Sequence, residues 1–335
     1  MYSIKVLLSK DKKLHKCLKS QYNKNMINML LLGTGTSHGV PCIACKCEVC
    51  TSTDEHDKRF RCSAYVTSSN KKDGYEPHIL VDIGPDFRSQ ALKFDICAVD
   101  AVLLTHSHAD HLHGLDDIRI FSHTISSSHL TNPEQGKETE GNGLPFFTNK
   151  KTIADLKYRF DYVFKETQIG GGKPKIRLED CADLKNTQPK EFGDIRVLPV
   201  SMLHGSLVDT GWLFSCKEED GSIHSIAYLT DASSIPQESI DFINKMAGNL
   251  DHVVIDGLRK EPHATHMSFL QAMEVCEKLG PKHTWFTHMS HNNSHKEIIR
   301  YAQSQLKNFP RLEQIVKDGG SVLPAYDSLV ISTEK

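Results

Sequence analysis

Residues 105–111 read Thr-His-Ser-His-Ala-Asp-His and follow an apolar run at 101–104, and this feature constrains the fold more than any other. Four side chains that can bind a metal fall within six positions: His106, His108, Asp110 and His111. Imidazole suits zinc, iron and other first-row ions, and a carboxylate widens the choice toward manganese. The pattern predicts a metal site where a strand ends at the edge of a sheet. The competing interpretation is a polar surface turn that is rich in histidine by coincidence.

The spacing within this turn predicts two metals. If a helical segment follows the strand, His106 and His108 project from the strand end, while Asp110 and His111 point elsewhere. Two ions about 3.5–4 Å apart can share a hydroxide and bind both the attacking and the leaving oxygen atoms of a displacement. The remaining ligands must then come from other parts of the chain.

Three further candidates lie just beyond predicted strands. Strands are predicted at 195–200, 225–230 and 284–287, and the residues that follow them include His204, Asp231 and His288. Strand ends are where an open sheet places its site. Each of these residues alone fits an ordinary loop, but with the heptapeptide they complete a set of seven ligands.

The His-x-His-x-Asp-His signature, with the three later residues, resembles the metallo-β-lactamase superfamily of metallohydrolases. The resemblance implies an α/β fold, an αββα sandwich of two mixed sheets flanked by helices, with two divalent ions, zinc or manganese, along the sheet edges. By the same resemblance, the first metal is held by His106, His108 and His204, the second by Asp110, His111 and His288, and Asp231 bridges them. Asp110 also counts as catalytic. Histidine at position 108, where di-iron members usually carry glutamate, favours hydrolysis.

A second cluster consists of Cys45, Cys47 and Cys50 in a Cys-x-Cys-x-x-Cys run. Structural zinc is tetrahedral and needs a fourth ligand, for which His291 is the candidate. The chain has ten cysteines and no secretory signal, which favours metal ligands over disulfides. A cluster of free thiols is the alternative, and Cys42 is a competing ligand. The arrangement resembles the PhnP-like cyclic phosphodiesterase branch, over about residues 29–331.

The segment Gly33-Thr-Gly-Thr-Ser-His-Gly39 precedes these cysteines and invites comparison with a phosphate-binding loop. It lacks the Gly-Lys-Ser/Thr ending that such a loop requires. We therefore expect a tight turn that leads a strand at 27–32 toward the cysteine cluster.

A proton donor for the leaving group is predicted at His266. This residue precedes a helix that is marked by a capping box of Ser268 and Gln271 and by Gly280-Pro281 at its end. Histidine can act as a general acid near neutral pH, and in the PhnP-like branch a histidine at this position has that role. His263 is the local competitor, and packing at the helix start is the structural alternative.

Three more residues are candidates for supporting roles. Asp82 ends a predicted strand and is expected to orient a ligand histidine. Arg61 and Arg119 are candidates for contacts with a phosphate, although exposed arginines are common.

Composition predicts a basic N-terminal extension at 1–26 and a single domain at 27–335, with a polar surface insertion at about 122–144. The chain has a net charge of −2, yet residues 1–28 contain seven lysines and one aspartate. This lead has no clear targeting signal, so we expect a cytoplasmic location, with organellar targeting as the alternative. A helix is predicted at 152–165. The sequence contains no run of 18 consecutive apolar residues, so no membrane span is predicted.

Three functions are compatible with these features. The favoured one is a metal-dependent phosphodiesterase that acts on a small or cyclic phosphate ester through a metal-bridging hydroxide. RNA 3′-end processing as in tRNase Z is the alternative, although the net acidic body does not favour a nucleic-acid partner. The third is a non-catalytic zinc protein, against which the seven-ligand set argues. A homodimer is compatible with the sequence, which does not determine the oligomeric state.

Overall fold

The computed structural model describes residues 27–68, 75–123, 143–165, 172–181 and 189–333. The predicted extension at 1–26 lies outside these residues, as does most of the predicted insertion at 122–144. The described ends of that insertion belong to regular elements, because residues 122–123 close a helix and residue 144 opens a strand.

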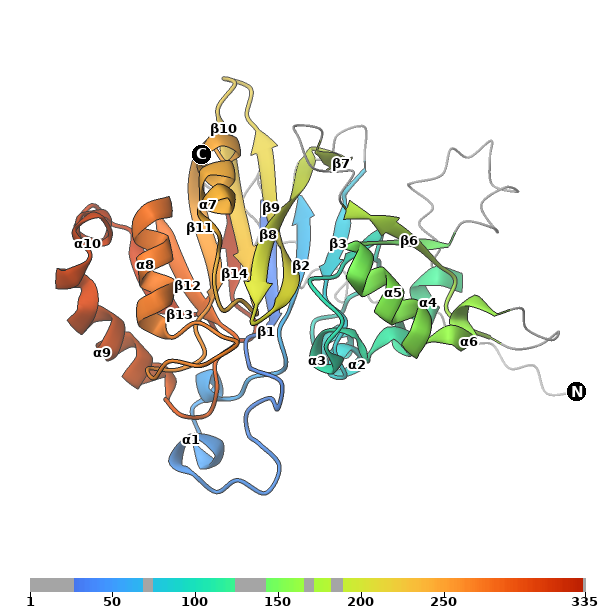
Figure 1. Cartoon of the computed structure of the whole chain (residues 1–335), viewed down its shortest axis with the longest axis horizontal. Helices are drawn as coiled ribbons and strands as arrows, with labels where there is room; N and C mark the ends of the chain where they lie inside the picture. Colours follow the sequence, from blue (N-terminus) through green and yellow to red (C-terminus); the bar gives the residue numbers. More distant parts are fainter. Residues whose placement is uncertain (1–26, 69–74, 124–142, 166–171, 182–188, 334–335) are drawn as a thin grey trace, which may run out of the picture.

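Two sheets of seven strands each lie face to face at the centre of the molecule (Figure 1). The first sheet has the order β14 (Val330–Ser332), β1 (Ile27–Gly33), β2 (Ser63–Ser68), β3 (His78–Val81), β4 (Ala101–Leu103), β5 (Leu144–Thr148), β6 (Ile176–Asp180). The second has the order β7 (Lys190–Phe192), β8 (Ile195–His204), β9 (Leu207–Lys217), β10 (Ile223–Leu229), β11 (Asn249–Asp256), β12 (His283–Thr287), β13 (Ser321–Pro324). In each sheet three antiparallel pairs are followed by three parallel pairs, so the two halves repeat one topology.

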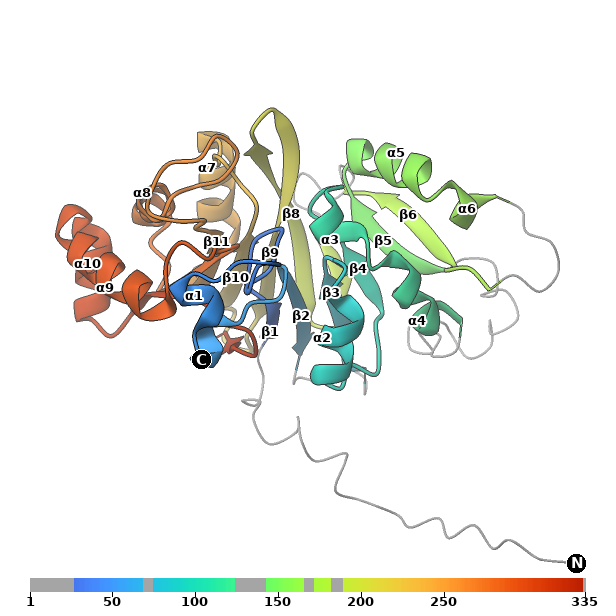
Figure 2. The same ribbon diagram turned by 90° about the horizontal axis from the view of Figure 1, so that it is seen from below.

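Helices cover the outer face of each sheet, as Figure 2 shows. On the first sheet lie α2 (Phe87–Lys93), α3 (Ala109–Leu112), α4 (Arg119–His123), α5 (Lys150–Arg159) and α6 (Asp161–Phe164). On the second lie α7 (Gln237–Met246), α8 (Phe269–Leu279), α9 (His295–Gln305) and α10 (Pro310–Lys317). A short helix, α1 (Glu48–Thr51), belongs to the segment that carries the cysteine cluster. The predicted αββα sandwich is thereby confirmed.

Alternation along the strands distributes the apolar side chains among three cores. In β1, Met29 and Leu31 pack between the two sheets, while Leu30 and Leu32 pack under the helices of the first sheet. Successive side chains of a strand point to opposite faces, and a sheet that is covered on both sides needs apolar residues on both. The continuous apolar runs of the sequence are the consequence.

Helix α8 begins and ends as its sequence predicts. The Ser268 side chain accepts from the Gln271 backbone, the Gln271 side chain accepts in return, and Gly280 ends the helix in the left-handed conformation. The helix predicted at 152–165 differs, because it begins earlier and divides into α5 and α6. Asn149 caps the Thr152 N–H, and Phe160 leaves helical geometry with φ −115° and ψ 40°.

No helix among the described residues is both long enough and apolar enough to cross a membrane.

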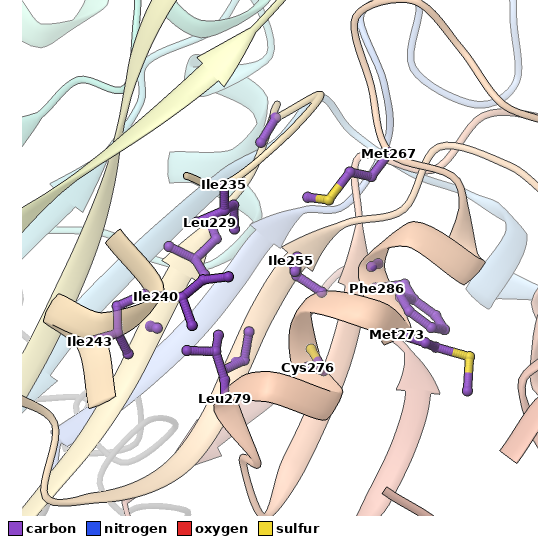
Figure 3. Packing of buried hydrophobic residues seen from close by; sticks show 14 of the residues in the cluster. Leu229, Ile235, Ile240, Ile243, Ile255, Met267, Met273, Cys276, Leu279 and Phe286 are labelled. Carbon is purple, nitrogen blue, oxygen red and sulfur yellow. The ribbon is translucent and has the colours of Figure 1, made fainter. Parts of the chain in front are cut away.

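Replacement of Ile255 should destabilise the fold strongly, because this side chain is fully buried between the second sheet and its helices (Figure 3). We expect Ile255→Ala to lower the free energy of unfolding by about 2–5 kcal/mol, and Ile255→Val by about 0.5–1.5 kcal/mol. Urea unfolding followed by circular dichroism measures both. The control is Val208→Ala, at a side chain that is 54% exposed. A similar loss in the control would contradict the assigned core.

Candidate metal centre

Three polar residues that follow strands of the two sheets have a strained backbone conformation. Asp82 follows β3, Asp231 follows β10 and His288 follows β12, with φ of 58°, 62° and 57°. Non-glycine residues rarely adopt this left-handed region, and each instance costs about 1–3 kcal/mol. The packed sheets hold the three residues in this conformation.

The first group of possible metal ligands contains His106, His108, His204 and Asp231. Their ligand atoms all lie within 4.8 Å of one another. His106 and His108 follow β4, and His204 is the last residue of β8. The His106 and His108 rings lie 4.5 Å apart between centroids, and the His108 and His204 rings 4.9 Å apart.

The second group contains Asp110, His111, His288 and again Asp231, within the same 4.8 Å limit. Asp110 and His111 lie in α3, which approaches the loop after β3 closely because residue 84 is glycine. A Cβ atom on Gly84 would lie 1.9 Å from the Asp110 carbonyl oxygen. The structure thus brings together all seven predicted ligands in two groups that share the Asp231 carboxylate, which also belongs to a third possible group with Asp256, His266 and His288.

Asp231 lies between the two groups. Its Oδ2 atom is 2.7 Å from His111 Nε2 and 3.4 Å from both His106 Nε2 and His288 Nε2. Burial alone would raise the pKa of Asp231, but the neighbouring His288 and His106 hold it well below its usual range. Asp231 is therefore an anion in a buried position.

The ligand set fits divalent ions. His106 Nε2, His111 Nε2 and both ring nitrogen atoms of His288 are buried without a hydrogen-bond partner. Such groups are rare in folded proteins, where buried polar atoms are ordinarily paired. One ion in each group would satisfy one nitrogen atom of each of these rings, and a mixed imidazole and carboxylate set suits zinc or manganese.

Hydrogen bonds from the opposite ring nitrogen fix the orientation of two ligands. His111 Nδ1 donates to Asp82 Oδ2 at 2.7 Å, and His204 Nδ1 donates to the Thr265 carbonyl at 2.7 Å. Both rings therefore carry the proton on Nδ1 and leave Nε2 for a metal. Asp82, for which a supporting role is predicted, also accepts from the Thr105 N–H at 2.9 Å.

The predicted cysteine cluster forms a separate group with His291. The Sγ atoms of Cys45, Cys47 and Cys50 lie 3.4, 3.4 and 3.5 Å from His291 Nδ1. Tetrahedral zinc requires sulfur–nitrogen separations of about 3.5 Å, given its bond lengths to the two ligand types. Cys42 is not in the group: its thiol donates to the Gly39 carbonyl, and its N–H donates to Cys50 Sγ.

A buried ion pair connects this cysteine segment to the loop after β12. Arg59 Nη1 donates to the Ser290 carbonyl at 2.7 Å, and Arg59 Nη2 lies 3.4 Å from Asp57 Oδ1. The same Asp57 oxygen accepts from the His295 N–H at 2.7 Å. The loop that contains both His288 and His291 is thus held from two sides.

His266, the predicted proton donor, lies beside the shared carboxylate. Its Nδ1 atom is 3.0 Å from Asp256 Oδ2 and 3.1 Å from Asp231 Oδ1, and its ring stacks on His288 at 4.6 Å. Burial lowers its pKa, but the hydrogen bonds to Asp231 and Asp256 outweigh this and raise the pKa of His266 to about 10.

The remaining predicted residues lie near the site or apart from it. His263 is exposed, with its ring 5.2 Å from that of His266. Arg61 is paired with Asp86 at 2.9 Å, and its Nε donates to the Ser37 carbonyl. Arg119 donates to the Gly172 carbonyl, and the described contacts do not connect it with any of the seven ligands.

Two buried aspartates at the site were not predicted. Asp256 ends β11 and accepts from His266, so the strand-end rule that selected Asp231 would also have found it. Asp209 lies inside β9, where no sequence signal marks it, and its Oδ1 atom is 3.7 Å from His106 Nδ1.

The chain is similar to proteins of the β-lactamase superfamily. The family model described as "Beta-lactamase superfamily domain" matches residues 78–289. A crystal structure of a diphosphatase from the PhnP family shares 33% sequence identity with this chain, with a TM-score of 0.68, covering 92% of this chain and 98% of that one. The human short-form tRNase Z superposes with a TM-score of 0.54 at 15% identity over 92% of this chain and all of that one, which indicates a shared fold only.

A curated relative from Porphyromonas gingivalis (strain ATCC BAA-308 / W83), named octanoyltransferase, is 31% identical over 308 residues. The match covers 91% of this chain but only 55% of the relative, so the chain spans about half the length of that protein.

Metal analysis should distinguish the cysteine group from the groups that contain Asp231. Purified protein is expected to contain about three ions per chain, of which mild chelation leaves one, because a closed tetrahedral site releases zinc slowly. Cys47→Ser should remove that resistant ion, while Cys97→Ser, at an exposed cysteine outside the group, should not. Finding one ion in total in the unmodified protein would contradict the two-ion site.

Asp82→Asn should weaken metal binding without removing a ligand. The change takes away the charge that orients His111, for which a loss of about 10- to 100-fold in metal affinity is expected. Titration of the metal-free protein with zinc measures it. Asp241→Asn, on the exposed surface of α7, is the control, and equal affinities in the two variants would argue against the supporting role of Asp82.

Proposed function

We propose a function from the premise that this chain belongs to the metallo-β-lactamase superfamily and resembles its PhnP-like enzymes. It is a hydrolase of this fold, and the proposed activity is hydrolysis of a small phosphate diester. One observation carries the proposal: the buried Asp231 carboxylate is shared by the two four-residue groups that contain the seven predicted ligands. A scaffold protein that keeps zinc for structure alone has no use for such an arrangement.

The residues of both groups would hold two divalent ions. When bound, such ions lower the pKa of water to about 7 and stabilise negative charge on phosphoryl oxygen atoms. His106, His108 and His204 would hold one ion, and Asp110, His111 and His288 the other, with Asp231 between them.

His266 is proposed to protonate the departing oxygen. Asp256 accepts from His266 Nδ1, so Nε2 remains as the nitrogen that can deliver a proton to a substrate. Asp256 acts through His266 and is a positioning residue.

Acyl transfer, which the name of the Porphyromonas relative suggests, finds less support in this site. An acyl-enzyme intermediate needs an activated nucleophile such as a thiolate. Cys62 lies near enough to His111 and Asp231 to feel their charges, but burial raises its pKa to about 12. The named activity belongs to a protein of which the match covers only 55%.

RNA 3′-end processing remains the second hydrolytic candidate. The likeness to tRNase Z supports a shared fold and does not by itself indicate a shared substrate. The cysteine group with His291 is a further feature of this chain, and it is part of the resemblance to the PhnP-like branch. The two candidates are separated by assays with a precursor tRNA and with a small diester.

The protein is expected to hydrolyse bis(p-nitrophenyl) phosphate after addition of zinc or manganese, and His266→Ala should lower kcat by about 10²- to 10⁴-fold. Release of p-nitrophenolate measures the rate, and elemental analysis should find unchanged metal content. His263→Ala is the matched control, because this exposed histidine lies beside His266 without contacting Asp256.

Two outcomes would contradict these assignments. Loss of bound metal in His266→Ala would make His266 a ligand, and a larger loss of kcat in His263→Ala would make His263 the acid. Absence of any activity from the metal-loaded protein would overturn the diesterase itself.

A further inference from the structure

We infer that Arg159 binds a second anionic group of the substrate, so that the preferred substrates carry another phosphate beside the scissile phosphoryl group. The inference rests on the proposed phosphodiesterase function and specifies its substrate class. Arg159 is the exposed last residue of α5 and lies outside the seven-ligand set.

Helix α5 is attached to the metal centre at its first turn. Asn149, its cap, donates from Nδ2 to Thr210 Oγ1 at 3.0 Å. The Thr210 N–H in turn donates to the Thr105 carbonyl at 3.2 Å, directly before His106. The start of α5 is therefore fixed relative to the first metal ligand.

The last turns of α5 contact the ligand turn itself. Ser107 Oγ donates to Asp155 Oδ2 at 2.7 Å, and Arg159 Nη1 donates to the Ser107 carbonyl. Ser107 lies between His106 and His108 in the sequence. The guanidinium group is consequently held beside the first metal site rather than being free to move through solvent.

Arg159 contributes a positive charge beside that site, because its guanidinium group contacts the carbonyl of Ser107, the residue directly before His108. His108 is only partly buried, so an anion that approaches it from solvent enters the field of Arg159.

No carboxylate of the described residues forms an ion pair with Arg159, in contrast to Arg59 and Arg61. Asp155, one turn earlier, feels the charge of Arg159 but uses its oxygen atoms for hydrogen bonds with Ser107 and with Lys151, the latter at 3.0 Å. The guanidinium group keeps its charge and further N–H donors, which match the geometry of a phosphate. A simple diester is satisfied by the two ion sites, whereas a diphosphate ester has a second phosphate for this group.

The test compares two substrates that differ in the second phosphate: bis(p-nitrophenyl) phosphate, which has none, and ADP-ribose, a diphosphate diester. With metal-loaded full-length protein, Arg159→Ala is expected to raise KM for ADP-ribose by about ten- to a hundredfold, the loss of a charge-assisted hydrogen bond. Its kcat/KM for bis(p-nitrophenyl) phosphate should change less than about twofold, within the range of exposed charges. Arg159→Lys should lie between, since lysine keeps the charge without the planar donors.

Lys157→Ala is the matched control, because it removes one positive charge from the exposed surface of α5 without a contact to Ser107. It should behave as the unmodified protein with both substrates, and metal content should stay unchanged in every variant. Equal losses with both substrates in Arg159→Ala would make Arg159 a support of the ligand turn and overturn the inference. Hydrolysis of bis(p-nitrophenyl) phosphate but not ADP-ribose by the unmodified protein would also overturn it while leaving the diesterase intact. Failure with both substrates would overturn the proposed function as well.

Discussion

The Asp231 carboxylate is the group on which the centre depends. It is buried, it belongs to both ligand groups, and it also contacts His266. A buried anion is stable only beside compensating charge or metal. Asp231 therefore depends on its histidine neighbours, and its strained backbone conformation places the carboxylate beside them. The two packed sheets supply the rigidity that holds this strained residue in place, because each half ends its parallel strands at the same edge of the sandwich.

The repeated topology explains how ligands from distant segments meet. Asp82 follows β3 and Asp231 follows β10, strands at the same position in the two sheets, and both residues adopt the left-handed conformation. Asp231 is shared by the two ligand groups, whereas Asp82 accepts a hydrogen bond from His111 Nδ1, the ring nitrogen opposite the one left for a metal. The cysteine group and the Arg59–Asp57 pair then fix the loop of His288 and His291 from outside the sandwich. Residues outside the ligand set therefore support the ligands that follow strands of both sheets.

Local sequence patterns predicted many of the strands and helices, because these patterns depend on residues that are neighbours in the sequence. The capping box at Ser268 and the apolar alternation of the strands correspond to observed elements. The helix at 152–165 was only partly correct, since Phe160 interrupts it where its ring packs edge-on against His113. Asp209 could not be found from the sequence, because a polar residue inside a strand gains its meaning only from what the adjacent strands place beside it.

The order of residues along the chain was enough to identify which side chains can bind metal and that they follow strands, and the family resemblance carried by the motifs already implied the fold and the sharing of Asp231. That Asp256 lies behind His266, and that Arg159 reaches the carbonyl of Ser107, emerges only in the folded molecule. The difference lies in the separation along the chain of the residues that interact. Ligand chemistry and alternation are local properties of the chain, whereas distances between segments depend on strand order and on the packing of helices against the sheets.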